Sequence, residues 1–178
     1  MTPQVKDGEG LKTWIRDVPD FPIAGVLFRD ITPLLENPQA FRQAIDQLVE
    51  PYRNQQIDLI AAIEARGYLL AAPIAYSLGI GMVPVRKPGK LPFTTVRQEY
   101  TLEYGTNTLE MHADAVKTGQ RVLIIDDVIA TGGSAKATAN LIERVGGTVA
   151  GFSFLIELDF LNGRQVLTDY NIHSVLHY

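Results

Sequence analysis

Three largely apolar segments constrain the fold of this chain more than any other feature of its sequence. They are IDLIAAI at 57–63, RVLIID at 121–126 and TVAGFSFLIEL at 148–158. Apolar runs without alternation are typical of strands that are covered on both faces, as in a parallel sheet. Because segments with helical character lie between them, the sequence predicts an α/β fold, a mostly parallel sheet flanked by helices.

Three helices are expected around these strands. The Asn-Pro pair at 37–38 forms a helix start, and apolar residues follow at helical spacing as far as Tyr52. A second helix is predicted at about 68–78, before a short strand at about 82–85. A third is predicted at about 134–145, where a glycine pair ends it. Strands and helices therefore alternate along the chain.

Composition limits the size class and the partners. A chain of 178 residues, 46% of them hydrophobic, can bury one full core but is short for two, so we expect one domain over 1–178. Cysteine is absent, which fits a reducing cytoplasm. The net charge of -4 gives no broad reason to bind nucleic acid or a membrane. Residues 67–85 lack charge, but prolines and glycines interrupt them, which argues against a membrane span.

Residues 87–107 fit neither a helical nor a strand period. The segment contains Pro88, Gly89 and Pro92, several polar and charged pairs and two tyrosines. It is longer than an ordinary connection in a compact domain, and loops of this length are usually lids or binding elements. We therefore expect a flexible flap over a site at about 87–107.

Two acids and a glycine-rich loop follow the apolar run that begins at residue 121. Ligands of open parallel sheets gather where strands end and loops begin, and Asp126 and Asp127 lie at such an end. The loop leads into a predicted helix, whose free N–H groups and positive dipole end favour a phosphate. Glycines permit close approach, and hydroxyl groups can donate hydrogen bonds. The loop residues are Ala130, Thr131, Gly132, Gly133 and Ser134.

A ribose with a 5′-phosphate satisfies both halves of this motif. Carboxylates do not bind a phosphate, but they accept hydrogen bonds from the neighbouring hydroxyls of a sugar. Both acids can serve one ligand where the strand is already turning into the loop, because strand neighbours otherwise point to opposite faces. The alternative is a helix cap beside a turn that binds nothing, although a cap needs only one acid.

The motif at 121–134 resembles the signature of the type I phosphoribosyltransferases, an apolar strand, two acids and a small-Thr-Gly-[Gly/Thr]-[Ser/Thr] loop. Further stretches resemble the adenine-specific members of that family, so that the resemblance covers about 20–157. They are DFPIAGVLFRDITPLL (20–35), EARGYLLAAPIA (64–75), VRKPGKLP (85–92) and YTLEYGTNTLEMH (100–112). The resemblance implies the fold of that family, with a small N-terminal base-covering segment at about 1–36.

The resemblance also implies a reaction of purine salvage, in which 5-phosphoribosyl 1-diphosphate and adenine give AMP and pyrophosphate. Asp126 and Asp127 would bind the ribose hydroxyls, and residues 130–134 would surround the 5′-phosphate. Arg66, directly after a predicted strand, is expected to donate to the pyrophosphate and to stabilise it as it leaves. The alternative for Arg66 is a surface ion pair with Glu64.

Other site residues are implied by the same resemblance. Lys90 would meet the pyrophosphate within the subunit, and Arg86 would reach the site of the partner in a homodimer; the alternative is a solvated basic run. Glu103 is expected to exchange a proton with the purine ring, or else to be a flap carboxylate without a role. The backbone of Leu27 would read the amine edge of adenine with Arg29 beside the base, unless Arg29 forms only a surface ion pair.

Mg²⁺, held mainly by the phosphates and hydroxyls of the substrate, is the expected cofactor. His112, His173 and His177 are scattered without metal-ligand spacing, so no metal-ligating side chains are predicted. Three other functions stay open at this point: transfer to another purine base, a non-catalytic ribose-phosphate sensor, and a module that binds AMP itself.

Overall fold

The chain divides into two compact units, residues 1–47 and 48–178. The computed structural model describes residues 9–101 and 105–178. The single domain expected over 1–178 stays a prediction.

An antiparallel strand pair is the main feature of the N-terminal unit. β1 (Arg16–Pro19) pairs with β2 (Leu27–Asp30). The helix start predicted at 37–38 is confirmed, because the side-chain oxygen of Asn37 accepts hydrogen bonds from two backbone N–H groups of the first turn, at 3.0 and 2.9 Å. The helices are α1 (Glu9–Lys12), α2 (Thr32–Glu36) and α3 (Pro38–Val49), which ends in the next unit.

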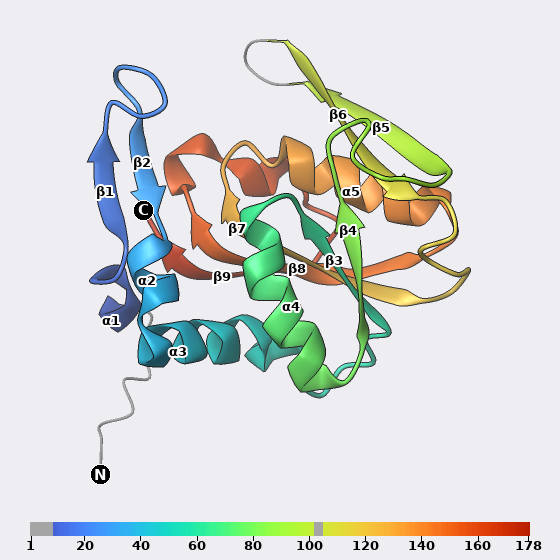
Figure 1. Ribbon diagram of the computed structural model, residues 1–178, viewed down its shortest axis with the longest axis horizontal. Helices are drawn as coiled ribbons and strands as arrows, with labels where there is room; N and C mark the ends of the chain where they lie inside the picture. Colours follow the sequence, from blue (N-terminus) through green and yellow to red (C-terminus); the bar gives the residue numbers. More distant parts are fainter. Residues whose placement is uncertain (1–8, 102–104) are drawn as a thin grey trace. The chain divides into compact units, whose positions relative to one another are not determined.

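The C-terminal unit is built on a five-stranded sheet in which every pair of neighbours is parallel (Figure 1). The strand order is β4-β3-β7-β8-β9. The three apolar segments of the sequence supply β3, β7 and β8, so the predicted fold class is confirmed. The strands are β3 (Leu59–Ile63), β4 (Gly81–Val85), β7 (Arg121–Ile129), β8 (Thr148–Glu157) and β9 (Ile172–His177).

Two crossover helices make a topological switch point. α4 (Arg66–Leu78) leads from β3 to β4, and α5 (Gly133–Arg144) leads from β7 to β8. β3 and β7 are neighbours, but the chain leaves them in opposite directions along the sheet. Crossovers of the usual right hand then place the two helices on opposite faces. Open α/β sheets bind their ligands at the carboxyl ends of two such strands.

A β-hairpin replaces much of the irregular segment expected at 87–107. β5 (Thr95–Thr101) pairs antiparallel with β6 (Thr106–His112). Only two side chains of β5 are large and apolar, Val96 and Tyr100, so no apolar period marks this strand in the sequence. The expectation of irregular chain was therefore wrong for these residues, while the flexibility of the flap stays a prediction.

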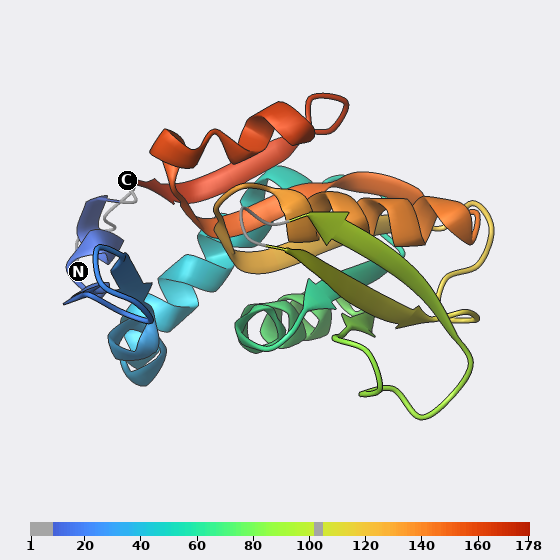
Figure 2. The ribbon, with the colours of Figure 1, turned by 90° about the horizontal axis from the view of Figure 1, so that it is seen from above.

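The hairpin is fastened to α5 by hydrogen bonds. β5 lies along α5 in both ribbon views (Figures 1 and 2). The guanidinium of Arg144, in the last turn of α5, donates to the Arg97 carbonyl and to the Gln98 side chain, each at 2.5 Å. Both acceptors belong to β5, so the middle of this strand follows the position of the helix.

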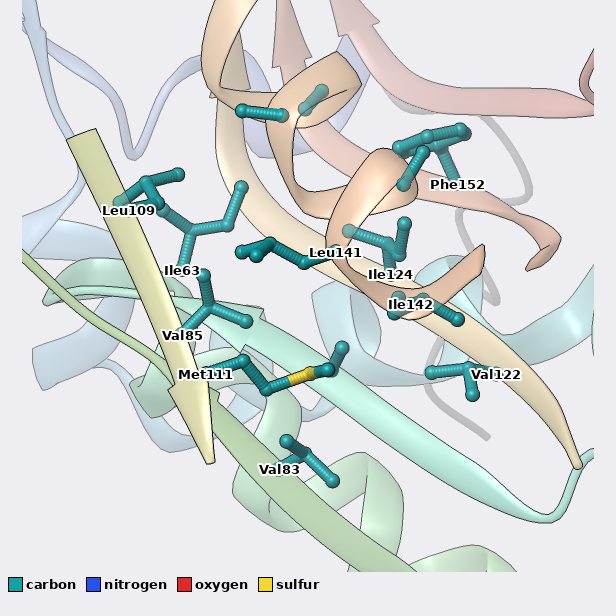
Figure 3. Packing of buried hydrophobic residues seen from close by; sticks show 14 of the residues in the cluster. Ile63, Val83, Val85, Leu109, Met111, Val122, Ile124, Leu141, Ile142 and Phe152 are labelled. Atoms are coloured by element: carbon teal, nitrogen blue, oxygen red, sulfur yellow. The ribbon is translucent and has the colours of Figure 1, made fainter. Parts of the chain in front are cut away.

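The second hairpin strand is part of the hydrophobic core (Figure 3). Leu109 and Met111 of β6 are 2% and 0% exposed. Their side chains gather with Ile63 of β3 and Val85 of β4 in one cluster, which also includes Leu141 of α5. The hairpin is therefore anchored in the core through β6.

β4 forms one edge of the sheet. The Val85 carbonyl accepts a hydrogen bond from the Glu64 N–H at 3.0 Å and so faces β3. The backbone N–H and C=O groups of consecutive strand residues point to opposite sides. The backbone of Pro84 therefore faces the outer side, where its missing N–H breaks no hydrogen bond of the sheet. Beyond β4, Arg86 exchanges backbone hydrogen bonds with Glu110 of β6 at 2.9 and 2.7 Å.

The last twenty residues, which lie beyond the stretch that the resemblance covers, contain the other edge strand, β9. Two short 3₁₀ helices, η2 (Asp159–Leu161) and η3 (Gly163–Val166), precede β9, and a third, η1 (Glu50–Tyr52), follows α3. Across 9–101 and 105–178, no helix is both long and apolar enough to cross a bilayer. A cytoplasmic location stays a prediction.

Candidate active site

A cavity of about 300 Å³ lies at the switch point between β3 and β7. Residues from the ends of both strands, the start of α4, the loop before α5 and the hairpin line it. Its wall contains five charged side chains, three carboxylates and two cations. They are Glu64, Arg66, Lys87, Asp126 and Asp127.

The two acids lie within β7, because this strand continues to Ile129 instead of turning at residue 126. Asp126 and Asp127 are 9% and 4% exposed, and both line the cavity. Oδ1 of Asp126 accepts a hydrogen bond from the Asp127 backbone N–H at 2.9 Å. A Cβ on Gly67 would lie 2.8 Å from this same oxygen. Glycine in the first turn of α4 therefore makes room for the Asp126 carboxylate beside a helix N-terminus, which favours a negative charge.

Arg66 pairs with one of these acids. Its Nε lies 2.8 Å from Oδ2 of Asp127. Glu64, considered from the sequence as a surface partner of Arg66, accepts from Nε of Arg86 at 2.8 Å. The guanidinium of Arg66 is thus held at the cavity wall, where the sequence placed a donor for pyrophosphate.

Burial raises the pKa of both acids above the ordinary aspartate value. For Asp126 the loss of hydration is the main cause, and the charge of Asp127 beside it adds to the rise. For Asp127 the loss of hydration again raises the pKa, while the Arg66 guanidinium opposes the rise. Two buried carboxylates therefore share one nearby cation, and sugar hydroxyls would supply hydrogen bonds that the protein provides only in part.

The loop after β7 has the geometry of an anion site. Gly132 adopts φ 80°, a left-handed conformation that favours glycine, and α5 begins at Gly133. The first N–H groups of a helix lack intrahelical partners, so this loop presents donors and a positive dipole end. Ala130 and Ser134 line the cavity itself. The structure thus brings the predicted loop and the two acids to one cavity.

Gly163 supports this loop from behind, which the sequence did not reveal. A Cβ on Gly163 would lie 2.3 Å from the Ala130 carbonyl oxygen, and a Cβ on Gly132 would lie 2.5 Å from the Gly163 carbonyl oxygen. Arg164, the residue after Gly163, is held in place by Glu157, whose carboxylate oxygen lies 2.6 Å from Nε of Arg164. The sequence signal was weak, since an Asn-Gly pair in a polar stretch indicates only a turn.

The basic residues near the flap occupy different positions. Lys87, which the sequence analysis did not choose, lines the cavity. Arg86 pairs with Glu64, and one of its terminal nitrogens donates to the Lys90 carbonyl at 3.1 Å. Arg86 therefore shapes the loop that carries Lys87 and Lys90, and the predicted contacts of Arg86 and Lys90 with pyrophosphate stay predictions.

Tyr100 closes the hairpin side of the cavity. It lines the cavity, and its ring carbon Cδ2 lies 3.1 Å from where a Cβ on Gly133 would be. Burial raises the pKa of the Tyr100 phenol. An aromatic ring therefore covers the start of α5, where the sequence showed only a tyrosine within an irregular segment.

Three further site residues were predicted from the resemblance. Glu103 falls outside the described residues. Leu27 and Arg29 belong to β2 in the N-terminal unit, where Arg29 forms an ion pair with Asp17 of β1. Their roles stay predictions from the resemblance.

Residues 30–171 match the model of the phosphoribosyl transferase domain. The chain belongs to the phosphoribosyltransferase family. Among its relatives, the adenine phosphoribosyltransferase of Desulfitobacterium hafniense is 58% identical over 165 residues, which cover 93% of this chain and 95% of the relative.

Solved phosphoribosyltransferase structures share the fold. The adenine phosphoribosyltransferase of Thermoanaerobacter pseudethanolicus has a TM-score of 0.94 at 53% identity, covering 96% of this chain and 99% of that chain. The enzyme of Saccharomyces cerevisiae was solved with an imino-altritol bisphosphate and adenine. It has a TM-score of 0.89 at 39% identity, and the match covers 95% of this chain and 98% of that chain.

The buried acids of this phosphoribosyltransferase predict opposite effects of Asp126→Asn on stability and on binding. The folded-state pKa of Asp126 is raised, so this carboxyl favours folding at low pH and loses that contribution as pH rises through its folded pKa. The variant should melt like wild type near pH 4 and at a higher temperature than wild type as pH increases. Binding of ribose 5-phosphate should weaken tenfold or more, since a charged hydrogen bond contributes about 1.5–3 kcal/mol.

Thermal melting between pH 4 and 9, with titration calorimetry of ribose 5-phosphate, measures both effects. Asp114→Asn, at an exposed carboxylate, is the control and should change neither. A variant that melts below wild type at high pH would contradict the idea that the buried, ionised acid pair destabilises the fold.

Gly163→Ala should weaken ribose 5-phosphate binding several-fold, because the added methyl group must push Ala130 and the phosphate loop out of place. Overpacking of this kind also costs about 1–3 kcal/mol of folding free energy. Gly147→Ala is a matched control, since its Cβ would lie 2.7 Å from Val116 and 2.8 Å from Ile142, both outside the cavity wall. Calorimetry and urea unfolding should show a loss of stability in both variants and a loss of affinity only in Gly163→Ala.

Proposed function

We propose that this chain transfers the 5-phosphoribosyl group of 5-phosphoribosyl 1-diphosphate to adenine, giving AMP and pyrophosphate in purine salvage. The observation that carries the proposal is the meeting of a buried acid pair and a glycine-rich helix start in one cavity. Relatives with more than half of their residues identical over nearly the full chain are adenine phosphoribosyltransferases.

The sugar phosphate is oriented by two features of β7 and the loop that follows it. Asp126 and Asp127 accept hydrogen bonds from the ribose hydroxyls, and the N–H groups of the loop at 130–134 donate to the 5′-phosphate. The two contacts hold opposite ends of the sugar. The anomeric carbon is thereby fixed in one orientation, which lowers the entropic cost of the transfer.

The reaction separates charge at the anomeric carbon. The bond from this carbon to the pyrophosphate oxygen breaks, and its electron pair leaves with pyrophosphate. A nitrogen of the purine imidazole ring bonds to the carbon and loses its proton. The sugar is cation-like in the transition state, so nearby carboxylates stabilise it, while Arg66 and Lys87 face the charge of the leaving group.

Exclusion of water is assigned to the hairpin. Tyr100 already covers one side of the cavity, and β6 fixes the base of the hairpin in the core. Water would otherwise capture the cation-like sugar and waste the substrate. We propose Glu103 as the acceptor of the purine proton, on the resemblance alone, with Lys90 and Arg86 as further pyrophosphate ligands on the same grounds.

Mg²⁺ fits the chemistry of this cavity. It prefers oxygen ligands and keeps several waters, and the wall offers the carboxylates of Glu64, Asp126 and Asp127. We propose that Mg²⁺ is held mainly by the substrate, where it would neutralise charge on the pyrophosphate. The protein contributes acceptors for the water molecules bound to Mg²⁺ and for the sugar hydroxyls.

Adenine recognition is assigned to the N-terminal segment at about 1–36. We propose that the Leu27 backbone reads the amine edge of the base and that Arg29 lies beside it, as the resemblance implies. A site that pairs donors with acceptors rejects bases with the wrong pattern strongly.

Turnover with each purine base tests the main proposal. The purified chain is mixed with Mg²⁺, 5-phosphoribosyl 1-diphosphate and adenine, hypoxanthine, guanine or xanthine, and pyrophosphate and nucleotide are measured. Adenine should be the preferred base, and AMP and pyrophosphate should form in equal amounts. Turnover with another base alone would overturn the base assignment, whereas tight binding of the sugar phosphate without turnover would identify a sensor.

We further propose a homodimer. Large apolar side chains are exposed on one face of α4 and on the neighbouring edge strand: Leu69 is 50% exposed, Tyr76 90% and Met82 37%. Leu69 and Tyr76 are seven residues apart, so they share a helix face. Such a patch favours association with another chain.

Tyr76→Lys should shift the chain towards monomer, because it places a charge within this apolar patch. Sedimentation velocity over a range of concentrations measures the shift. Phe160→Lys, at an apolar residue 69% exposed in η2, is the control and should leave association unchanged. A wild-type chain that sediments as a monomer at every concentration would contradict the proposal.

A further inference from the structure

Three side chains that are far apart in the sequence meet beyond the end of the sheet. Glu157 ends β8, His177 ends β9 and Asp159 begins η2. Backbone hydrogen bonds hold these ends together, since Tyr178 N–H donates to the Glu157 carbonyl at 3.0 Å and Asp159 N–H donates to the Tyr178 carbonyl at 2.9 Å. One ligand-type atom from each of the three side chains lies within 4.8 Å of the other two.

Glu157 carries an unpartnered buried oxygen that faces this cluster. The residue is 5% exposed, and its Oε1 lies 2.6 Å from Nε of Arg164. Its Oε2 is buried without a hydrogen-bond partner. Nδ1 of His177 lies 4.0 Å from this oxygen. A buried carboxylate oxygen without a donor is costly, so this one calls for a cation or another donor.

Other buried carboxylate oxygens differ from Glu157 in this respect. In the described parts of the chain, Oε1 of Glu110 and Oδ2 of Asp127 also lack a hydrogen-bond partner. Each of them, however, lies within ion-pair distance of a guanidinium, at 2.6 Å from Arg97 and 2.8 Å from Arg66. Oε2 of Glu157 has no such guanidinium contact among the described residues, because Arg164 pairs with Oε1 of the same carboxylate.

The spacing of the three groups suits a transition-metal ion. Zn²⁺ binds imidazole nitrogen and carboxylate oxygen at about 2.0–2.2 Å, which places neighbouring ligand atoms about 3–4 Å apart. Nδ1 of His177 lies 4.0 Å from Oε2 of Glu157, and its 2.9 Å contact with Oδ1 of Asp159 is a hydrogen bond that a bound ion would replace. The His177 and Asp159 side chains are 46% and 57% exposed, so both can adjust and water can complete the coordination.

We propose that Glu157, Asp159 and His177 form a Zn²⁺ site. The two carboxylates exceed the single charge of Arg164, so the cluster attracts a cation. An imidazole ligand favours Zn²⁺ over Mg²⁺, which prefers oxygen ligands only. The site is therefore distinct in chemistry from the magnesium assigned to the substrate, and it does not depend on the proposed reaction.

The site would join the ends of β8 and β9 to the start of η2, close to the phosphate loop. Leu158 N–H, between two of the ligands, donates to the Ile129 carbonyl at 3.0 Å, and Ile129 precedes the loop at 130–134. Glu157 also holds Arg164, next to Gly163, which supports that loop. Bound Zn²⁺ thus stabilises the wall behind the phosphate loop.

Titration of the whole chain with ZnCl₂, after removal of metal with a chelator, tests the proposal. Calorimetry should show one high-affinity ion, and His177→Gln should bind it at least about tenfold more weakly, as loss of a direct ligand exceeds the effect of losing an outer contact. His173→Gln, on the same strand, should bind like wild type. MgCl₂ should not compete.

Imidazole NMR signals separate this site from binding elsewhere, because the chain has three histidines. Zn²⁺ should shift the His177 ring signals first and at one equivalent, and Asp159→Asn should weaken that shift. Absence of high-affinity binding would overturn the proposal. Binding that leaves the His177 ring unchanged, or that is equally tight in His177→Gln, would overturn it as well.

Discussion

The burial of two adjacent carboxylates is the constraint on which the rest of this structure depends. Asp126 and Asp127 lie in the central strand of the sheet with Arg66 as a nearby cation. Their charges are tolerated because a helix N-terminus, a guanidinium and a backbone N–H face them. The protein therefore keeps a region of unfavourable electrostatics in its interior, and a ligand rich in hydroxyl groups relieves it.

The order of the strands explains why these groups meet. β3 and β7 are parallel neighbours, so the starts of α4 and α5, which follow them, both lie at the same end of the sheet. One helix start accommodates the acids, and the other provides the loop for an anion. Fold and chemistry are linked here by topology, because no other pair of neighbouring strands in this sheet has a crossover helix leaving each of them.

The parts that the sequence predicted are those with a strong local signal. The apolar segments indicated β3, β7 and β8, and Asp126 with the loop at 130–134 indicated a sugar phosphate site. β5 was missed because its stability comes from pairing with β6 and from docking on α5, which leaves little apolar period. β6 was missed because only Leu109 and Met111 alternate there, too short a pattern to indicate a strand. Lys87 and Gly163 were missed for a related reason, since their positions depend on contacts between segments that are distant in the sequence.

The outer edge of β4 has a consequence for how copies of this chain can meet. Pro84 presents no N–H on that side, and the Arg86–Glu110 bridge occupies the backbone groups just beyond it. A strand from a neighbouring molecule therefore finds no continuous ladder to extend at this edge. Open-ended sheet growth, the route to fibrous aggregates, is blocked there, and contacts between molecules on this side must be made by side chains.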